Sequence, residues 1–356
     1  MASTVLSLCN PINLSLDRLG RIVSVPELVC PAGNLPSLKV AVDNGADWVY
    51  MGLKDETNAR NFAGLNFDAA SAREGLRYAH AAGAKMLLAI NTYPQGLAAK
   101  RWQRAIDDAA ELGIDAVILA DAGLMRYAAE RHPQLRLHLS VQTSATNYEA
   151  INFYHERFGI ERAVLPRVLS LAQVADVVKN TAVQIEVFGF GSLCVMVEGR
   201  CALSSYVTGE SPNTHGVCSP AKAVRWEKHG EILDARLNGI LIDRFESGEN
   251  AGYPTLCKGR FSVEDETYYA IEEPSSLNAM ALLPELAKIG ISAIKIEGRQ
   301  RSPAYVAAVT RIWRAAIDAH ARDAARFAVQ ADWQSGLARL AEGQQHTLGA
   351  YHRKWK

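Results

Sequence analysis

Four of the six cysteines gather in one part of the chain, where their thiolates could hold a metal. Six, sixteen and thirty-eight residues separate Cys194, Cys201, Cys218 and Cys257. A zinc knuckle needs close pairs such as CxxC, and no such pair is present. Wide and unequal spacing means that the ligands come from separate loops, and four such thiolates can enclose a [4Fe–4S] cluster. A zinc site of unusual spacing, reversible disulfides and unrelated buried thiols stay open as alternatives.

The residues around these cysteines suit an anionic centre. Glycines recur beside them and permit close approach of backbone N–H groups, which can donate to sulfur. Four cations near them could offset the charge of four thiolates: Arg200, Lys222, Lys258 and Arg260. The two remaining cysteines, Cys9 and Cys30, have no assigned role. Cys30 lies at the end of an expected strand, where a buried structural thiol is the preferred interpretation and a nucleophile the alternative.

Alternating strands and helices must position these residues. The expected strands are 27–30, 48–51, 85–90, 116–120, 135–141, 162–165, 184–188 and 292–296. Helical patterns lie between them, as in 35–44, 68–82, 100–112 and 170–179, and several end at a glycine directly before the next strand. Eight strands in this alternation predict an α/β fold, a (β/α)8 TIM-barrel-like architecture.

The spacing of the strands predicts the domain organisation. About 100 residues separate the seventh strand from the eighth, too many for a structureless loop. We therefore expect a large cysteine-bearing insertion, 190–290, within a barrel domain that spans 27–322. Residues 1–26 are expected to be a disordered appendage. Residues 323–356 are expected to be a tail whose aromatic residues Trp333, Tyr351 and Trp355 pack on the barrel.

Polar residues cluster where the expected strands end, which is the catalytic face of a (β/α)8 barrel. Among them, Arg167, Arg299 and Arg301 are candidate substrate-binding residues, because a guanidinium binds a carboxylate through two hydrogen bonds. The alternative is that Arg299 and Arg301 form salt bridges with Glu297 and neighbouring acids. The sequence assigns no catalytic residue.

Composition narrows the class of protein. The 38 basic residues balance 38 acidic ones, so the net charge is zero and non-specific nucleic-acid binding is disfavoured. No apolar run reaches the roughly 18 residues that a membrane-spanning helix needs. We expect a cytoplasmic protein with no transmembrane segment, whose thiols stay reduced.

One long run resembles a known family. Residues 186–204 contain Glu186, Phe188, Gly191-Ser192, Cys194, Gly199-x-Cys201 and Ser204, a pattern similar to the signature of the collagenase-like peptidases, family thirty-two of the unclassified peptidases. Further segments resemble the ubiquinone-biosynthesis branch of that family, namely 30–34, 57–66, 208–213, 249–260, 295–303 and 347–355. The resemblance begins near residue 27 and excludes the first 26 residues.

This resemblance implies a function. It implies a [4Fe–4S] cluster bound by Cys194, Cys201, Cys218 and Cys257, and a subunit of an O2-independent hydroxylase that acts on ubiquinone precursors. It also implies a heterodimer with the paralogue UbiV, assistance from a UbiT-like lipid carrier, a quinone precursor as substrate and prephenate as the oxygen donor. Which hydroxylation step is served, and whether this chain or its partner performs it, stays open.

Two alternatives come from other members of the family. A peptidase finds little support, because the HExxH motif of zinc peptidases and the G-x-S-x-G motif of serine hydrolases are both absent. An RNA-base hydroxylase is disfavoured by zero net charge, and no nucleic-acid partner is expected. A structural cluster in an assembly scaffold is a further possibility.

Overall fold

The strands form a closed parallel barrel, as predicted. The computed structural model describes residues 14–16, 22–61, 64–94, 98–194, 201–212 and 216–352. Eight strands follow one another around the barrel: β3 (Glu27–Pro31), β4 (Trp48–Met51), β5 (Lys85–Ile90), β6 (Ala116–Leu119), β7 (Arg136–Leu139), β8 (Ile160–Val164), β9 (Gln184–Ser192) and β16 (Ala293–Ile296). Because β16 pairs in parallel with both β3 and β9, the sheet closes and the α/β TIM-barrel-like fold is confirmed.

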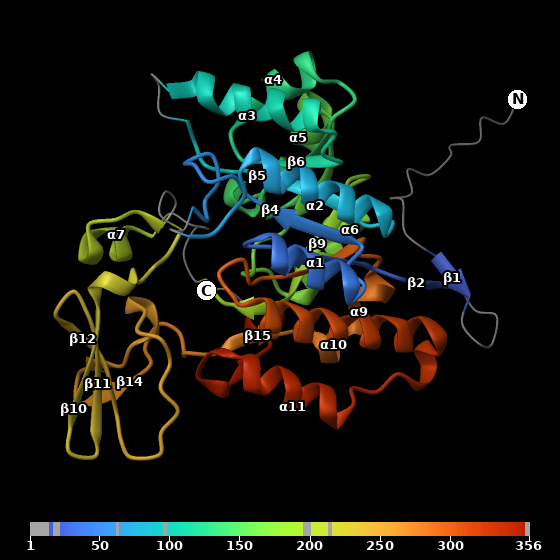
Figure 1. Ribbon diagram of the computed structural model, residues 1–356. Coiled ribbons are helices and arrows are strands. Elements are labelled where there is room, and N and C mark those ends of the chain that lie inside the picture. Colours follow the sequence, from blue (N-terminus) through green and yellow to red (C-terminus); the bar gives the residue numbers. More distant parts are fainter. Residues whose placement is uncertain are drawn as a thin grey trace, which may run out of the picture.

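Helices surround the barrel (Figure 1). They are α1 (Leu35–Asp43), α2 (Ala69–Ala81), α3 (Ala99–Leu112), α4 (Ala122–Arg131), α5 (Tyr148–Phe158), α6 (Leu171–Lys179), α9 (Leu283–Ile289) and α10 (Pro303–Arg322). Six begin at a side chain that caps the first turn: Asn34, Asp68, Asp121, Asn147, Ser170 and Ser302. Gly113 and Gly290 end α3 and α9 in the left-handed conformation, as the helix–glycine–strand pattern predicts.

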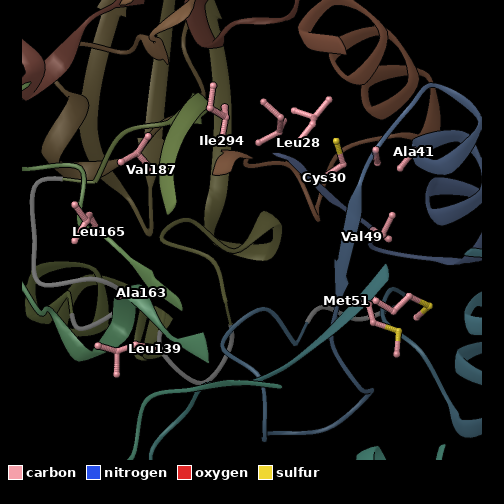
Figure 2. Close-up of a cluster of buried hydrophobic side chains, with 14 of the residues drawn as sticks. Leu28, Cys30, Ala41, Val49, Met51, Leu139, Ala163, Leu165, Val187 and Ile294 are labelled. Carbon is pink, nitrogen blue, oxygen red and sulfur yellow. The ribbon is translucent and has the colours of Figure 1, made fainter. Parts of the chain in front are cut away.

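Alternate strand residues face the surrounding helices and form the main core. Figure 2 shows part of this layer, which includes Leu28, Val49, Val187 and Ile294. Cys30 belongs to it and is fully buried, with Thr310 donating a hydrogen bond to its sulfur at 3.3 Å. Burial raises the pKa of Cys30 to about 12, so this thiol is protonated at neutral pH. The geometry thus favours a structural thiol over a nucleophile.

The other strand residues point into the barrel, where a charged network is enclosed. Arg162 pairs with Glu27, and its Nη1 lies 3.6 Å from Glu186 Oε2. Lys295 Nζ lies 2.6 Å from Glu186 Oε1, and both residues are buried. His138 is fully buried beside Trp48, with a ring-centroid distance of 5.6 Å. The interior of the barrel is therefore filled by paired charges as well as by apolar side chains.

The chain between β9 and β16 builds a group of elements beside the barrel (Figure 1). After α7 (Ala202–Thr208), the strands β10 (Val224–His229), β11 (Ile232–Leu237) and β12 (Ile240–Phe245) form an antiparallel sheet, and β13 (Phe261–Val263) pairs with β14 (Glu266–Tyr268). β15 (Ser276–Asn278) then returns to pair antiparallel with β9. Short 3-10 turns complete the segment: η3 (Ala221–Ala223), η4 (Leu256–Lys258) and η5 (Met280–Leu282).

The two ends of the chain add smaller elements. β1 (Leu14–Leu16) and β2 (Ile22–Ser24) pair antiparallel, and the rest of 1–21 lies outside the described residues. After α10 come η6 (Ala324–Arg326), α11 (Ala331–Leu340), η7 (Glu342–Gln344), β17 (His346–Thr347), which pairs with β15, and η8 (Gly349–Tyr351).

Two of the three tail aromatics lie against the rest of the protein. Trp333 is buried, and Tyr351 Oη donates to the carbonyl of Phe188 at 3.1 Å. Trp355 lies outside the described residues. Among the described helices, none is both long and apolar enough to cross a lipid bilayer.

Candidate metal centre at the barrel mouth

The four clustered cysteines come from four separate segments, as their spacing predicts. Cys194 follows the end of β9, and Cys201 caps α7, accepting a hydrogen bond from Ser204 N at 3.3 Å. Cys218 lies in the loop before η3, and Cys257 lies within η4. Ser204 Oγ also binds the carbonyl of Cys218, so α7 and the Cys218 loop are tied together.

The four thiols are coupled electrostatically, because the pKa of Cys257 responds to the other three. Burial is the main cause that raises the pKa of Cys257 to about 12; Lys258 opposes the rise, and the charges of Cys218, Cys194 and Cys201 contribute to it. Burial also raises the pKa of Cys218, with Cys201 adding to the shift. Thiolates influence each other in this way only when they are close together in a poorly solvated place. A bound cation would remove the penalty by offsetting their charge.

The separation of the sulfur atoms tests which metal group fits. Around a zinc ion, Zn–S bonds of about 2.3 Å in a tetrahedron place the sulfurs about 3.8 Å apart. All four cysteines belong to the described part of the chain, and there no three of their sulfurs lie within 4.8 Å of one another. The sulfurs are therefore spaced more widely than a single zinc ion requires. This donor set fits a four-iron cluster, which is bound by four thiolates and is larger.

The cations expected around the cysteines are only partly found there. Lys258 and Arg60 both lower the pKa of Cys218 against the effect of burial. Lys222 instead pairs with Glu210, and Arg260 pairs with Glu249 and Asp243 away from the sulfurs. Arg200 lies outside the described residues. Arg60 was not identified as a site residue from the sequence, although it belongs to the resembling segment 57–66.

Glu297 lies at the mouth of the barrel, next to the cysteines, and orders the cations there. Its Oε2 lies 2.7 Å from Arg167 Nη2, and its Oε1 lies 3.6 Å from Arg60 Nη2. Burial alone would raise the pKa of Glu297, but Arg167, Arg60 and Lys258 outweigh burial and hold it below its usual value. The carboxylate is therefore ionised. Because Glu297 also influences the pKa of Cys218, the ion pairs and the thiols form one continuous site.

The structure separates the three candidate substrate-binding arginines. Arg167 is buried against the ring of Phe188, with Cζ 3.6 Å from the ring centroid, and pairs with Glu297. Arg299 is only 6% exposed and donates to Asn58 Oδ1 at 3.1 Å. Arg301 instead donates to the carbonyl of Leu340 at the end of α11, at 2.9 Å. The mouth thus receives Arg167 and Arg299, together with Arg60, but Arg301 turns toward α11.

Arg299 is a buried cation that makes no ion pair with the described residues. Burial lowers the pKa of Arg299 to about 10, so the guanidinium stays charged at neutral pH. Among the described residues no carboxylate lies within ion-pair distance of it, although Glu297 favours its charged form, and the ring centroid of Tyr50 is 5.7 Å from Cζ. A buried cation of this kind suits an anionic ligand. The expected salt bridge to Glu297 is made by Arg167 and Arg60.

Comparison with known proteins identifies the family. The sequence matches peptidase family U32 over residues 33–354, and the chain belongs to that family. It is 32% identical to tRNA hydroxylation protein P of Escherichia coli, over 82% of this chain and 68% of that protein. It is also 30% identical to the Porphyromonas gingivalis collagenase, over 83% of this chain and 66% of that protein. A third relative, the Escherichia coli 23S rRNA 5-hydroxycytidine C2501 synthase, is 30% identical over 82% of this chain and 39% of its own length.

Proposed function

We propose that the chain is the iron–sulfur subunit of an O2-independent hydroxylase that acts on ubiquinone precursors, as the ubiquinone biosynthesis protein UbiU does. The observation that carries the proposal is that four cysteines from separate segments are electrostatically coupled to one another beside a cation-lined barrel mouth. Two relatives are named for hydroxylation of RNA, which supports hydroxylation as the reaction type. UbiV as heterodimer partner and a UbiT-like lipid carrier belong to the same proposal.

The residues at the mouth would bind and orient the oxygen donor. Without O2, the oxygen atom must come from an organic molecule or from water, and a dicarboxylate such as prephenate suits a site of several arginines. Arg299 would bind one carboxylate, because it is buried with Asn58 as its hydrogen-bond partner. Glu297 holds Arg167 and Arg60 in place. A [4Fe–4S] cluster, when bound by Cys194, Cys201, Cys218 and Cys257, supplies electron transfer.

Charge at the cysteine-bearing segment supports a quinone precursor over RNA as the substrate. Residues 201–282 contain twelve Asp and Glu against seven Lys and Arg, a formal net charge of −5. An acidic surface beside the site repels phosphates, which RNA-binding surfaces must neutralise. The exposed aromatic side chains of this part of the chain, including Tyr206 and Trp226, belong to the same acidic segment. RNA hydroxylation stays the second candidate because of the names of the relatives.

A peptidase activity has less support. Among the described cysteines, the thiols whose pKa departs from its ordinary value are all shifted upward, whereas a nucleophilic thiol needs a lowered pKa. One relative is named a collagenase. Within the part of the site that the structure describes, Cys201, Cys218 and Cys257 have no base in hydrogen-bond contact of the kind that peptidases place beside a cysteine nucleophile.

One strain tests the proposal against its alternatives. A deletion strain is grown with and without O2, and its quinones and the nucleosides of its tRNA and rRNA are measured by mass spectrometry. The proposal expects an unhydroxylated quinone precursor to accumulate only without O2, and the wild-type gene to restore ubiquinone. Normal ubiquinone with a missing hydroxylated nucleoside would replace the proposal with RNA hydroxylation.

Protein purified under argon should be brown, with about four irons per chain.

A further inference from the structure

We propose that Arg60 is a positioning residue that joins the barrel mouth to the metal centre and raises the reduction potential of the cluster. This inference rests on the proposed function, because it requires that the four cysteines hold an iron–sulfur cluster. Arg60 itself touches no cysteine in a hydrogen bond and acts through the backbone and through its charge. Its partner in the same contact is Gln300.

The contact that carries the inference is a carbonyl bound by two side chains. Arg60 Nη1 donates to the carbonyl of Gly216 at 3.1 Å, and Gln300 Nε2 donates to the same oxygen at 3.1 Å. Gly216 lies two residues before Cys218. The two donors come from opposite parts of the sequence, Arg60 from the loop after β4 and Gln300 from the loop after β16. The loop that carries Cys218 is therefore held to the barrel by hydrogen bonds from two barrel loops.

The second guanidinium nitrogen of Arg60 is engaged by the barrel mouth. Arg60 Nη2 lies 3.6 Å from Glu297 Oε1, and Glu297 also pairs with Arg167. With Nη1 on Gly216 and Nη2 on Glu297, Arg60 bridges the metal-ligand loop and the carboxylate that orders the mouth. This arrangement distinguishes Arg60 from Arg299, whose described side-chain hydrogen bond is to the neutral Asn58. Arg60 therefore has the contacts of a positioning residue, and Arg299 is the arginine proposed to bind the donor.

The charge of Arg60 gives the contact an effect on electron transfer. Arg60 brings its positive charge to the loop of Cys218, because Nη1 bonds to the carbonyl of Gly216 two residues before that cysteine. Adding an electron to the cluster increases its negative charge, so a nearby cation stabilises the reduced form and raises the potential. Hydrogen bonds that order the ligand loop also limit the access of water to the sulfurs, which contributes to the potential and to resistance against O2.

Three variants separate charge from hydrogen bonding. Arg60→Met removes both the charge and the hydrogen bonds. Arg60→Lys keeps the cation but lacks the planar guanidinium that contacts Gly216 and Glu297 together. Gln300→Ala removes one hydrogen-bond donor to Gly216 without changing the charge. Arg136→Met is the matched control. It removes an arginine that pairs with Glu161 and lies at the start of β7, whereas the site lies where the strands end. Each protein is purified under argon, its iron is counted, and the cluster is titrated with dithionite while its EPR signal is followed.

The expected order of the potentials is specific. Arg60→Met should shift the midpoint potential to more negative values, and its cluster should bleach several-fold faster in air. Arg60→Lys should keep a potential near that of the wild type and bleach faster. Gln300→Ala should also bleach faster at a nearly unchanged potential, and Arg136→Met should match the wild type in both measurements.

The outcomes distinguish this inference from the proposed function. A wild-type protein without iron would overturn the proposed function, and this inference with it. A wild-type cluster with unchanged potential and bleaching in all Arg60 and Gln300 variants would overturn this inference alone. If Arg60→Met does not retain iron, Arg60→Lys and Gln300→Ala decide: faster bleaching in both supports the positioning role, and wild-type bleaching in both rejects it.

Discussion

At the scale of single residues, the unbalanced charge of a buried arginine marks the site more clearly than residue type alone. Arg167 and Arg299 are both buried, yet Arg167 pairs with Glu297 and Arg299 bonds to the neutral Asn58. Burying a cation without a nearby anion is costly, so such an arrangement persists where a ligand supplies the charge. Arg301, two residues further on, bonds to a carbonyl of α11 instead.

The first prediction compares these neighbouring arginines. Replacing Arg299 by Lys keeps the charge but removes bidentate geometry, and we expect product formation to fall about tenfold or more with iron content unchanged. Arg301→Lys should retain nearly full activity, because its guanidinium is directed away from the mouth. Activity and iron per chain are measured on both variants. Equal losses in the two variants would contradict the assignment of Arg299 to the donor site.

A second residue-scale prediction concerns His138. Both of its ring nitrogens are buried without a hydrogen-bond partner among the described residues. Burial, followed by the charges of Arg162, Arg136 and Lys295, holds the pKa of His138 well below 6.5 in the folded protein. The unfolded chain takes up this proton near pH 6.5, so acid favours unfolding. The contribution of His138 to stability is therefore present above about pH 6.5 and is lost as the pH falls toward its folded pKa.

The measurement is urea unfolding of the wild type and His138→Leu between pH 8 and pH 5, at matched iron content. Below about pH 6.5 the wild type should lose stability relative to the variant by up to about 1.4 kcal/mol per pH unit. At pH 8 the variant should be at least as stable, because it removes two unsatisfied polar atoms. A constant difference across this pH range would show that His138 is not held neutral by the fold.

At the scale of elements, a close contact between η4 and β12 positions Cys257, one of the proposed metal ligands. A Cβ atom on Gly259 would lie 2.3 Å from the carbonyl oxygen of Ile242 in β12. Only glycine therefore allows η4, which contains Cys257, to pack at this distance from the three-stranded sheet. The sheet supports the metal centre through backbone packing, although it supplies none of the four cysteines.

The third prediction tests this support. Gly259→Ala should push η4 away from β12, cost about 1–3 kcal/mol and lower the iron content, because Cys257 moves with η4. Gly239→Ala is a matched control: it lies in the β11–β12 turn at φ +84°, where a Cβ meets nothing within 4 Å. It should strain the turn locally and leave iron unchanged. Full iron content in Gly259→Ala would show that η4 tolerates the displacement.

At the scale of the whole molecule, the protein combines a closed barrel with a cysteine-bearing segment attached between β9 and β16. The barrel is complete without the cysteines at 201, 218 and 257, because β16 closes it directly against β3 and β9. The segment between β9 and β16 has a small core of its own, which includes Val224, Leu237 and Ile242. A core of that size stabilises little by itself, so the proposed cluster, when bound, should contribute much of the order of this segment.

The fourth prediction follows from this division. The double variant Cys218→Ala with Cys257→Ala should lose the cluster, keep the far-UV circular dichroism of the barrel, and lose amide-exchange protection in η4 and in β10–β12. Protection of β3 to β9 and β16 should stay at the wild-type level in hydrogen-exchange mass spectrometry. Loss of protection throughout the barrel would mean that the cluster is part of a single folding unit.

Much of the fold could be predicted from the sequence because its signals are local. Apolar runs of four to six residues, capping side chains such as Asp68 and Ser170, and glycines such as Gly113 and Gly290 lie within or beside the elements that they define. The spacing of the cysteines also showed that they come from separate loops. The resemblance of 186–204 extended these signals to a family, which the comparison over 33–354 confirms.

The remaining features depend on tertiary structure, because they are relations between residues far apart in the chain. Nothing local indicates that Arg60 and Gln300 bind one carbonyl, or that Arg167 takes the acid that Arg299 was expected to contact. Charges act through space, so the closure of the barrel decides which charged side chains lie close together. The sequence by itself therefore determined the strands, the helices and the candidate ligands, and the closed barrel decided which cations lie at its mouth.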